Sequence, residues 1–365
     1  MRGWPIPAEP WPVILGRELV GVFAIDDWQA HDGVVRFRGR LLVEPEVAMS
    51  LLSQRVAPFG YTPVIRSPEE ITLIRLHTAK SEQGTASWRR WWLNLALFVA
   101  TVLTTLFVGA IMEGAQPLGD PWSMLQGVPF SSSLLLILGF HELGHYLAAR
   151  AYGVQVSLPY FIPLPLPPMG TMGAVIRMRS PIPNRKVLFD IGVAGPLLGM
   201  LLAVPVIAIG LMLSPVKPVS GVILQEGNSL AYLFLKWLIK GPIPDGSDVM
   251  LHPMALAGWL GFFVTALNLM PLSQLDGGHI VYAVLGRGHR KIVWVFLGVL
   301  VLLYLVSRWE GWLVWVGLSV ALGLKHPPPL DDLTPLDPPR RFLALIALGL
   351  LVILLTPRPF AIYEF

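Results

Sequence analysis

The sequence predicts a mainly α-helical, polytopic membrane bundle of six or seven spans, with a small α+β module at its N-terminus. Three observations lead to this fold class. First, 54% of the 365 residues are hydrophobic and only 14% are charged, whereas soluble domains carry about 25% charged residues. Second, from Trp91 onward the chain consists largely of apolar stretches that are long enough to enter a bilayer. Third, the residues before Trp91 are mixed in polarity and alternate in short strand-like runs.

Residues 1–86 are predicted to be a cytosolic module with the element order β-α-β-β. In GVVRFRGRLL the apolar and basic residues alternate, as in a strand with one buried face. Two further strand-like stretches, YTPVIRS and EITLIRLHT, come later in the module. The arginines could indicate a nucleic-acid surface, but an exposed sheet face is the commoner reason, and we expect no nucleic-acid partner. Between the strands, EPEVAMSLLSQRVAPFG has apolar residues at helical spacing, namely Val47, Leu51, Leu52 and Val56.

Residues 87–365 are predicted to be the membrane domain. A span needs about 20 apolar residues, and the stretches near the C-terminus, within 293–355, are shorter than that. The sequence predicts at least six spans, and we expect seven. The candidate spans are 91–112, 131–149, 187–213, 254–272, 293–306, 312–324 and 342–355.

The distribution of Lys and Arg predicts the orientation. The chain opens without the apolar core and small-residue cleavage site of a secretory signal, so we expect its N-terminus in the cytosol. Most of the Lys and Arg residues beside the spans then fall in inner loops, which agrees with the positive-inside rule. We therefore expect an integral protein of the bacterial inner membrane, in contact with lipid, whose span 131–149 ends on the cytosolic side. The chain has no cysteine, which excludes disulfides and thiolate metal sites.

The span 131–149 contains the string HELGH, and ionisable residues inside a membrane helix indicate function by default. His141 and His145 are four residues apart, so they lie on one helix face, about one turn from each other. That spacing lets two imidazoles bind one Zn²⁺. Glu142 projects beside them, where it can take a proton from water at the metal. The structural alternative, two histidines hydrogen-bonded within the bundle, does not explain Glu142.

A catalytic zinc site needs three protein ligands, so a third must come from another part of the chain. The best candidate is Asp276, which follows the span 254–272 in the stretch NLMPLSQLDGGH and lies at a depth similar to that of His145. Local sequence alone equally allows Asp276 to cap a helix or a turn. A different kind of membrane metalloprotease would use a glutamate as third ligand, but Glu113 and Glu310 are expected on the outer side.

Two motifs together resemble the site-2 protease family of intramembrane zinc metalloproteases. That family combines His-Glu-x-x-His with a later Asn-x-x-Pro-x-x-x-Leu-Asp-Gly. The stretch 170–199 is similar to the branch that includes the chloroplast EGY-type and cyanobacterial members, and the segment 214–250 is too short for the PDZ domain of another branch. The resemblance covers about residues 120–285, which we take as the catalytic core. The residues that match the second motif are Asn268, Pro271, Leu275, Asp276 and Gly277.

The resemblance implies an activity and a role for each matched residue. Zinc would be bound by His141, His145 and Asp276. Glu142 would be the general base, and Asn268 would hold the substrate or the oxyanion. The reaction would be hydrolysis of a peptide bond within a transmembrane helix of a membrane-tethered protein. The Pro-rich stretch 158–180 would form a re-entrant hairpin whose edge pairs with the unwound substrate; an ordinary cytosolic loop is the alternative.

The sequence also allows two other functions. A proteolytically inactive zinc protein could serve as a membrane chaperone or scaffold, although zinc binding alone would not require Glu142. A metal-ion transporter would need polar residues along several spans, and the outer halves of these spans are almost entirely aliphatic. Gly195 and Gly199 are expected to serve helix packing. His279 either supports Asp276 or lies at the membrane interface, and the role of His326 is open.

Overall fold

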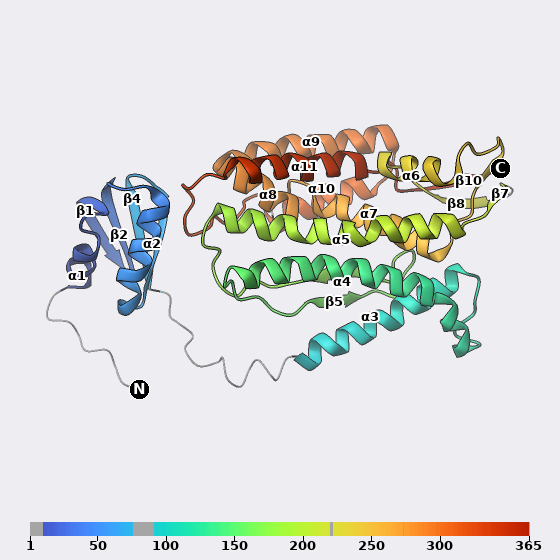
Figure 1. Ribbon diagram of the computed structural model, residues 1–365, viewed down its shortest axis with the longest axis horizontal. Helices are drawn as coiled ribbons and strands as arrows, with labels where there is room; N and C mark the ends of the chain where they lie inside the picture. The colour runs from blue at the N-terminus through green and yellow to red at the C-terminus, as the bar shows by residue number, and fades with distance from the viewer. Residues whose placement is uncertain (1–9, 76–90, 220–221, 273, 365) are drawn as a thin grey trace. The chain divides into compact units, whose positions relative to one another are not determined.

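The computed structural model describes residues 10–75, 91–219, 222–272 and 274–364 (Figure 1). It divides into two compact units. The first unit contains the N-terminal part of the chain up to Trp88 together with the separate segments 181–188 and 327–336. The second unit contains the rest of the chain, including most of the long helices.

The first unit is built on a four-stranded antiparallel sheet with the strand order β1-β2-β4-β3. The expected alternation in β2 is confirmed, because Val35 and Phe37 are buried while Arg36 and Arg38 are exposed. The hydrophobic core beneath the sheet is completed by residues of the two helices. The elements are α1 (Trp11–Glu18), β1 (Phe23–His31), β2 (Val34–Leu41), α2 (Pro45–Val56), η1 (Ala57–Phe59), β3 (Tyr61–Ser67) and β4 (Glu70–Arg75).

The observed element order differs from the expected β-α-β-β, because α1 and β1 precede it. Strand β1 is exposed over most of its length, so its residues carry little of the alternation that marks a half-buried strand. In α2 the buried residues include Leu52 and Val56, but Val47 is 48% exposed and the neighbouring Ala48 faces the core. The end of the last expected strand, at 76–78, and the expected module boundary near 86 lie outside the described residues.

Two later segments of the chain complete the first unit. Residues 330–332 run alongside β3: the Ile65 amide donates to the Leu330 carbonyl at 2.8 Å, and the Asp332 amide donates to the Ile65 carbonyl at 3.1 Å. The buried Asp332 carboxylate accepts a hydrogen bond from Arg185 Nε at 3.0 Å. The N-terminal module is thus packed in one unit with the first turn of helix α5 and with the chain that leads into α11.

The second unit is helical, and four helical runs are long and apolar enough to cross a membrane. These runs are Trp91–Met112, Pro121–Ala151, Arg185–Leu213 and Asp276–Ser307. Three other helices that coincide with expected spans are shorter, with 16, 12 and 17 residues for α7, α10 and α11. The helices are α3 (Trp91–Met112), η2 (Pro121–Gly127), α4 (Val128–Ala151), α5 (Arg185–Leu213), α6 (Leu230–Lys240), α7 (Pro253–Asn268), α8 (Asp276–Leu285), η3 (Gly286–Gly288), α9 (His289–Ser307), α10 (Gly311–Leu322) and α11 (Pro338–Leu354).

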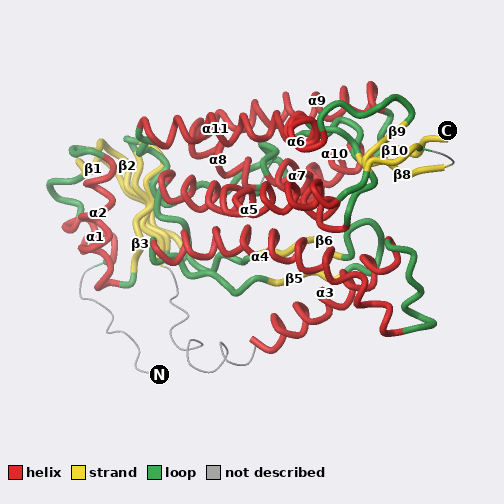
Figure 2. The backbone as a smooth tube through the Cα atoms, turned by 45° about the vertical axis from the view of Figure 1, so that its right-hand side comes forward, coloured by secondary structure: helices red, strands yellow, loops and turns green. Residues whose placement is uncertain are grey.

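A short hairpin lies against the first two of these long helices. Strand β5 (Tyr160–Pro163) pairs antiparallel with β6 (Thr171–Val175), and the pairing continues to a bridge between Val156 and Met178. Strand β5 contacts α3, β6 contacts α4, and α4 runs beside α5 (Figure 2). The other strands form two small pairs, β7 (Val216–Pro218) with β9 (Ser247–Val249) and β8 (Val222–Glu226) with β10 (Phe360–Glu364).

Candidate metal centre

Helix α4 brings the two histidines of HELGH together. Their rings are buried and meet edge to face, with centroids 4.8 Å apart and the two Nε2 atoms 3.1 Å apart. Glu142, between them in the sequence, is 7% exposed. Three ionisable side chains are thus withdrawn from solvent within one turn and a half of a helix, and burial of such groups requires partners.

The third group is Asp276, the first residue of α8. Its Oδ2 lies 3.1 Å from His141 Nε2, and its Oδ1 lies 3.3 Å from His145 Nε2. One ligand atom from each of the three residues lies within 4.8 Å of the others, and no other such group occurs among the residues that the structure describes. Two imidazole nitrogens and one carboxylate oxygen are a donor set that suits Zn²⁺ and leaves a fourth position open. The three side chains therefore lie close enough to bind one metal ion.

The outer side of His145 is held by the backbone of α5. His145 Nδ1 lies 2.7 Å from the carbonyl oxygen of Ile191. A carbonyl oxygen only accepts, so Nδ1 carries the proton. In the neutral imidazole that a metal needs, the lone pair is then on Nε2, on the side of Asp276. Metal-binding histidines commonly have such an outer partner, which fixes the tautomer and the ring orientation. This contact leaves no trace in the sequence, because any residue at position 191 offers a carbonyl.

Two glycines of α5 leave the room that the two rings occupy. A methyl group at Gly195 would overlap His145 Nε2, and one at Gly199 would lie 3.2 Å from His141 Cβ. On the other helix, a methyl group at Gly144 would lie 2.5 Å from the Ala194 carbonyl oxygen. The small residues let α4 and α5 pack closely, as expected, and the groups that pack there include the two imidazole rings of His141 and His145.

Two further polar groups reach the same place. Asn268, the last residue of α7, has its Nδ2 3.3 Å from His141 Nε2. The backbone of Ile176, which directly follows β6, lies beside the Glu142 carboxylate. The side chains that the sequence singled out, from α4, α7 and α8, are therefore neighbours. Glu113 and Glu310, the alternative third ligands, are not members of the metal-binding group.

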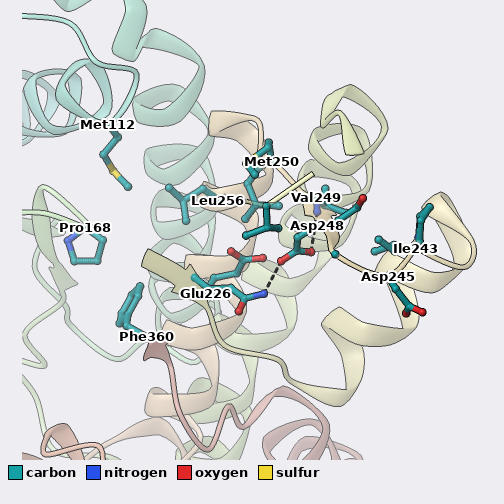
Figure 3. Close-up of a pocket in the computed structure, with 16 residues that line it drawn as sticks. Met112, Pro168, Glu226, Ile243, Asp245, Asp248, Val249, Met250, Leu256 and Phe360 are labelled. Atoms are coloured by element: carbon teal, nitrogen blue, oxygen red, sulfur yellow. Dashed lines mark hydrogen bonds between the residues drawn. The ribbon is translucent and has the colours of Figure 1, made fainter. Parts of the chain in front are cut away.

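A separate cavity of about 640 Å³ lies among the small strands and the end of α3, and none of its lining residues belongs to the metal-binding group (Figure 3). Two of its acidic side chains, Glu226 and Asp248, have partners within the chain. Glu226 accepts from the Tyr232 hydroxyl at 2.6 Å, and Asp248 accepts from Lys236 Nζ at 2.5 Å. Burial raises the pKa of the Glu226 carboxyl. The cavity therefore contributes nothing to the metal centre.

Comparisons with known proteins agree with these observations. Residues 129–305 match the family model described as Peptidase family M50. The chain is 36% identical to the probable zinc metalloprotease EGY1, chloroplastic, of Arabidopsis thaliana, over 63% of this chain and 43% of that protein. It is 30% identical to its Oryza sativa subsp. japonica counterpart over 76% and 52%. It is 26% identical to the Arabidopsis thaliana EGY2 protein over 77% and 53%. The chain spans about half the length of these curated relatives.

Proposed function

Because residues 129–305 are a peptidase family M50 domain, of the site-2 protease type, we propose that this protein is an intramembrane zinc metalloprotease. It hydrolyses a peptide bond within a transmembrane helix of a membrane-tethered protein, as in regulated intramembrane proteolysis. One observation carries the proposal: His141, His145 and Asp276 meet from two separate helices, with Glu142 buried beside them.

Each residue of the centre has a distinct task. His141, His145 and Asp276 would hold the zinc, which would supply Lewis acidity to polarise a peptide carbonyl and lower the pKa of water. Glu142 accepts a proton from the attacking water and passes it to the leaving nitrogen. The Asn268 amide donates a hydrogen bond to the oxyanion that develops on the substrate. His145 is kept in its binding orientation by the Ile191 carbonyl.

The β5–β6 hairpin presents the substrate to these groups. A transmembrane helix must unwind before its peptide bonds can be attacked, and its freed backbone groups then need new partners. Strand β6 lies against α4, and the Ile176 backbone beyond its end lies beside Glu142. A substrate segment paired along this hairpin would therefore have its backbone beside the base. The partner class is a protein with a membrane-spanning helix.

The membrane arrangement extends the observed helices. Four runs have the length and composition of spans, and we propose that α7, α10 and α11 raise the total to six or seven. Excess Lys and Arg in the loops on the N-terminal side favours a cytosolic N-terminus and an active site toward the cytosol. The bacterial inner membrane is the proposed location. The 1–86 module belongs to the cytosolic side, together with the segments 181–188 and 327–336 of its unit, and the rest of 87–365 forms the membrane domain.

The two alternative functions are not favoured. A zinc-binding scaffold or chaperone has no need for a buried carboxylate beside the ligands, yet Glu142 is placed there. A metal-ion transporter needs a series of polar groups along its path. Among the described residues, the one candidate metal group is confined to the C-terminal half of α4 and the first residue of α8.

The test compares the wild type with Glu142→Gln, using the full chain purified in detergent and a model membrane-helix substrate. The wild type should bind one zinc per chain and cleave. Glu142→Gln should retain zinc and cleave about 10²–10⁴-fold more slowly, which is the usual contribution of a general base. Glu113→Gln, at the end of α3, is the matched control and should cleave normally. Equal cleavage by Glu142→Gln would exclude it as the base, and a wild type without zinc would overturn the whole proposal.

A further inference from the structure

A cluster of aromatic and imidazole rings surrounds the part of α8 that follows Asp276. His279 lies three residues after Asp276, and its Nδ1 is 2.6 Å from His326 Nε2. The His326 ring, 8% exposed, stacks on Tyr282 with centroids 4.4 Å apart and planes inclined by 21°. The His289 ring lies 5.9 Å from both of these rings. The cluster joins α8, the start of α9 and the chain after α10.

The same cluster holds the loop that connects Asn268 with Asp276. His289 donates a hydrogen bond to the Pro271 carbonyl within that loop. The bond uses Nδ1, because Nε2 of the buried His289 is without a hydrogen-bond partner among the described residues. The rings therefore contact the chain on both sides of Asp276, at Pro271 in the loop before it and at His279 in the first turn of α8 after it.

The cluster also reaches the helix that orients His145. A methyl group at Gly192 of α5 would lie 2.9 Å from His279 Cβ, so the two helices are in close contact there. Gly192 follows Ile191, whose carbonyl holds His145 Nδ1. His279 is thus wedged between a glycine of α5 on one side and His326 on the other. A shift of His279 would move the first turn of α8, and the Asp276 carboxylate with it.

The three histidines are not a second metal site. In the described part of the chain, the only residues that offer three ligand atoms within 4.8 Å of one another are His141, His145 and Asp276. The short Nδ1–Nε2 separation of His279 and His326 is that of a hydrogen bond, in which one ring donates and the other accepts. Their contribution must therefore act through the position of a neighbouring group.

We propose that His279 and His326 form a positioning pair for Asp276, and this inference rests on the proposed metalloprotease function. The hydrogen bond joins residues 47 apart in sequence and ties the first turn of α8 to the chain after α10. It holds the Asp276 carboxylate at its distances of 3.1 and 3.3 Å from the two histidine Nε2 atoms. Outer partners of this kind typically contribute 10–100-fold to metal affinity or activity.

The test measures metal binding rather than cleavage alone. His326→Phe keeps a ring that can stack on Tyr282 but removes both nitrogens. The zinc affinity of the full chain in detergent is determined by competition with a chromophoric chelator, and the visible spectrum of the Co²⁺-loaded protein reports the coordination geometry. We expect about 10–100-fold weaker zinc binding and an altered Co²⁺ spectrum, with an unchanged thermal unfolding midpoint for the metal-free protein. His326→Gln, which can still hydrogen-bond His279, should recover most of the affinity.

Two further variants complete the test. His279→Phe should weaken zinc binding to the same extent, and the double variant should lose no more than either single variant, because all three remove the same bond. His252→Asn, which keeps a capping side chain at the start of α7, is the control and should bind zinc like the wild type. If His326→Phe fails to fold, His279→Phe decides. Wild-type affinity and spectrum in the folded variants would overturn the positioning role while leaving a zinc-binding, cleaving wild type intact. A wild type that binds no zinc would overturn the proposed function as well.

Discussion

Gly195 of α5 lies directly against the imidazole of His145, and a methyl group on Gly195 would overlap Nε2, the atom that faces Asp276. Helix α5 contributes none of the three candidate metal ligands, yet it limits the space that the His145 ring can occupy. It also supplies the Ile191 carbonyl that orients the same ring from its other nitrogen. One turn of α5 therefore fixes both the tautomer and the space of His145.

Substitution of this glycine should abolish the site. Gly195→Ala must displace the His145 ring, so we expect little or no zinc in the purified protein and loss of cleavage. Gly199→Ala should be milder, because its methyl group would lie 3.2 Å from His141 Cβ, and a small shift relieves the contact. Elemental analysis of the purified variants measures the effect.

The control for these variants is Gly139→Ala, in the same helix as the ligands. A methyl group at Gly139 has no heavy atom of the described residues within 4 Å. Alanine favours a helix interior by about 1 kcal/mol over glycine, so Gly139→Ala should keep its zinc and be at least as stable as the wild type. Normal zinc content in Gly195→Ala would show that α5 does not limit the position of His145.

Local spacing made the α4 part of the site predictable. A four-residue separation in a helix places His141 and His145 on one face whatever surrounds them. Asp276 required a chemical argument, the need for a third ligand at similar depth, because nothing in LDGG distinguishes a ligand from a turn. The sequence left open whether Asp276 caps a helix or a turn, and in the structure α8 begins at Asp276. Its two glycines weaken the helical pattern, and one of them packs closely, since a methyl group at Gly277 would overlap the Leu269 carbonyl.

The supporting contacts were beyond sequence reasoning for a physical reason. The bond from His145 to Ile191 and the pair of His279 and His326 join residues 46 and 47 apart. Such contacts depend on how helices pack, and packing is not encoded in any local period. The number of membrane spans could not be predicted for the same reason. Hydropathy identifies an apolar stretch, but α10 is only 12 residues long, so whether it crosses the bilayer depends on the helices packed around it.

The first unit should depend on one buried ion pair. Asp332→Ala removes the carboxylate that Arg185 contacts at 3.0 Å, where the two side chains are 4% and 16% exposed. A hydrogen bond to a charged group contributes about 1.5–3 kcal/mol, so its loss should make the segment around Asp332 separate from β3 more often. The Ile65 amide, which donates to Leu330 in that segment, should then exchange with deuterium roughly 10–100-fold faster. Glu46→Ala is the control: Glu46 is 61% exposed in its pair with Lys186, and such pairs contribute about 0–1 kcal/mol. Equal exchange in both variants would contradict a special role for Asp332.

Stability should fall with rising pH because of Glu226. Burial raises the pKa of this carboxyl in the folded protein. The folded state then binds more protons than the unfolded state. The stability gained from the protonated Glu226 carboxyl is therefore complete below the unfolded-state pKa of about 4.3. It is lost as the pH rises through the folded-state pKa. Glu226→Gln should flatten the pH dependence of the unfolding midpoint above pH 4.3. Asp245→Asn, an exposed residue of the same cavity, should leave it unchanged. An unaltered profile in Glu226→Gln would place the pH dependence elsewhere.

The hairpin contact with the base leads to a prediction that separates catalysis from metal binding. The backbone of Ile176 lies beside the Glu142 carboxylate, and we expect its N–H to donate to that carboxylate. Proline at position 176 has no N–H to donate. The preceding residue, Val175, is already in a strand, which is the conformation that a following proline favours. Ile176→Pro should therefore retain zinc, because Ile176 is not a ligand. It should cleave a membrane-helix substrate about 10–100-fold more slowly. That factor corresponds to the 1.5–3 kcal/mol of a hydrogen bond to a charged group. Ile176→Val keeps the amide and should cleave normally. If Ile176→Pro cleaves as fast as Ile176→Val at equal zinc content, the backbone of the hairpin does not orient Glu142.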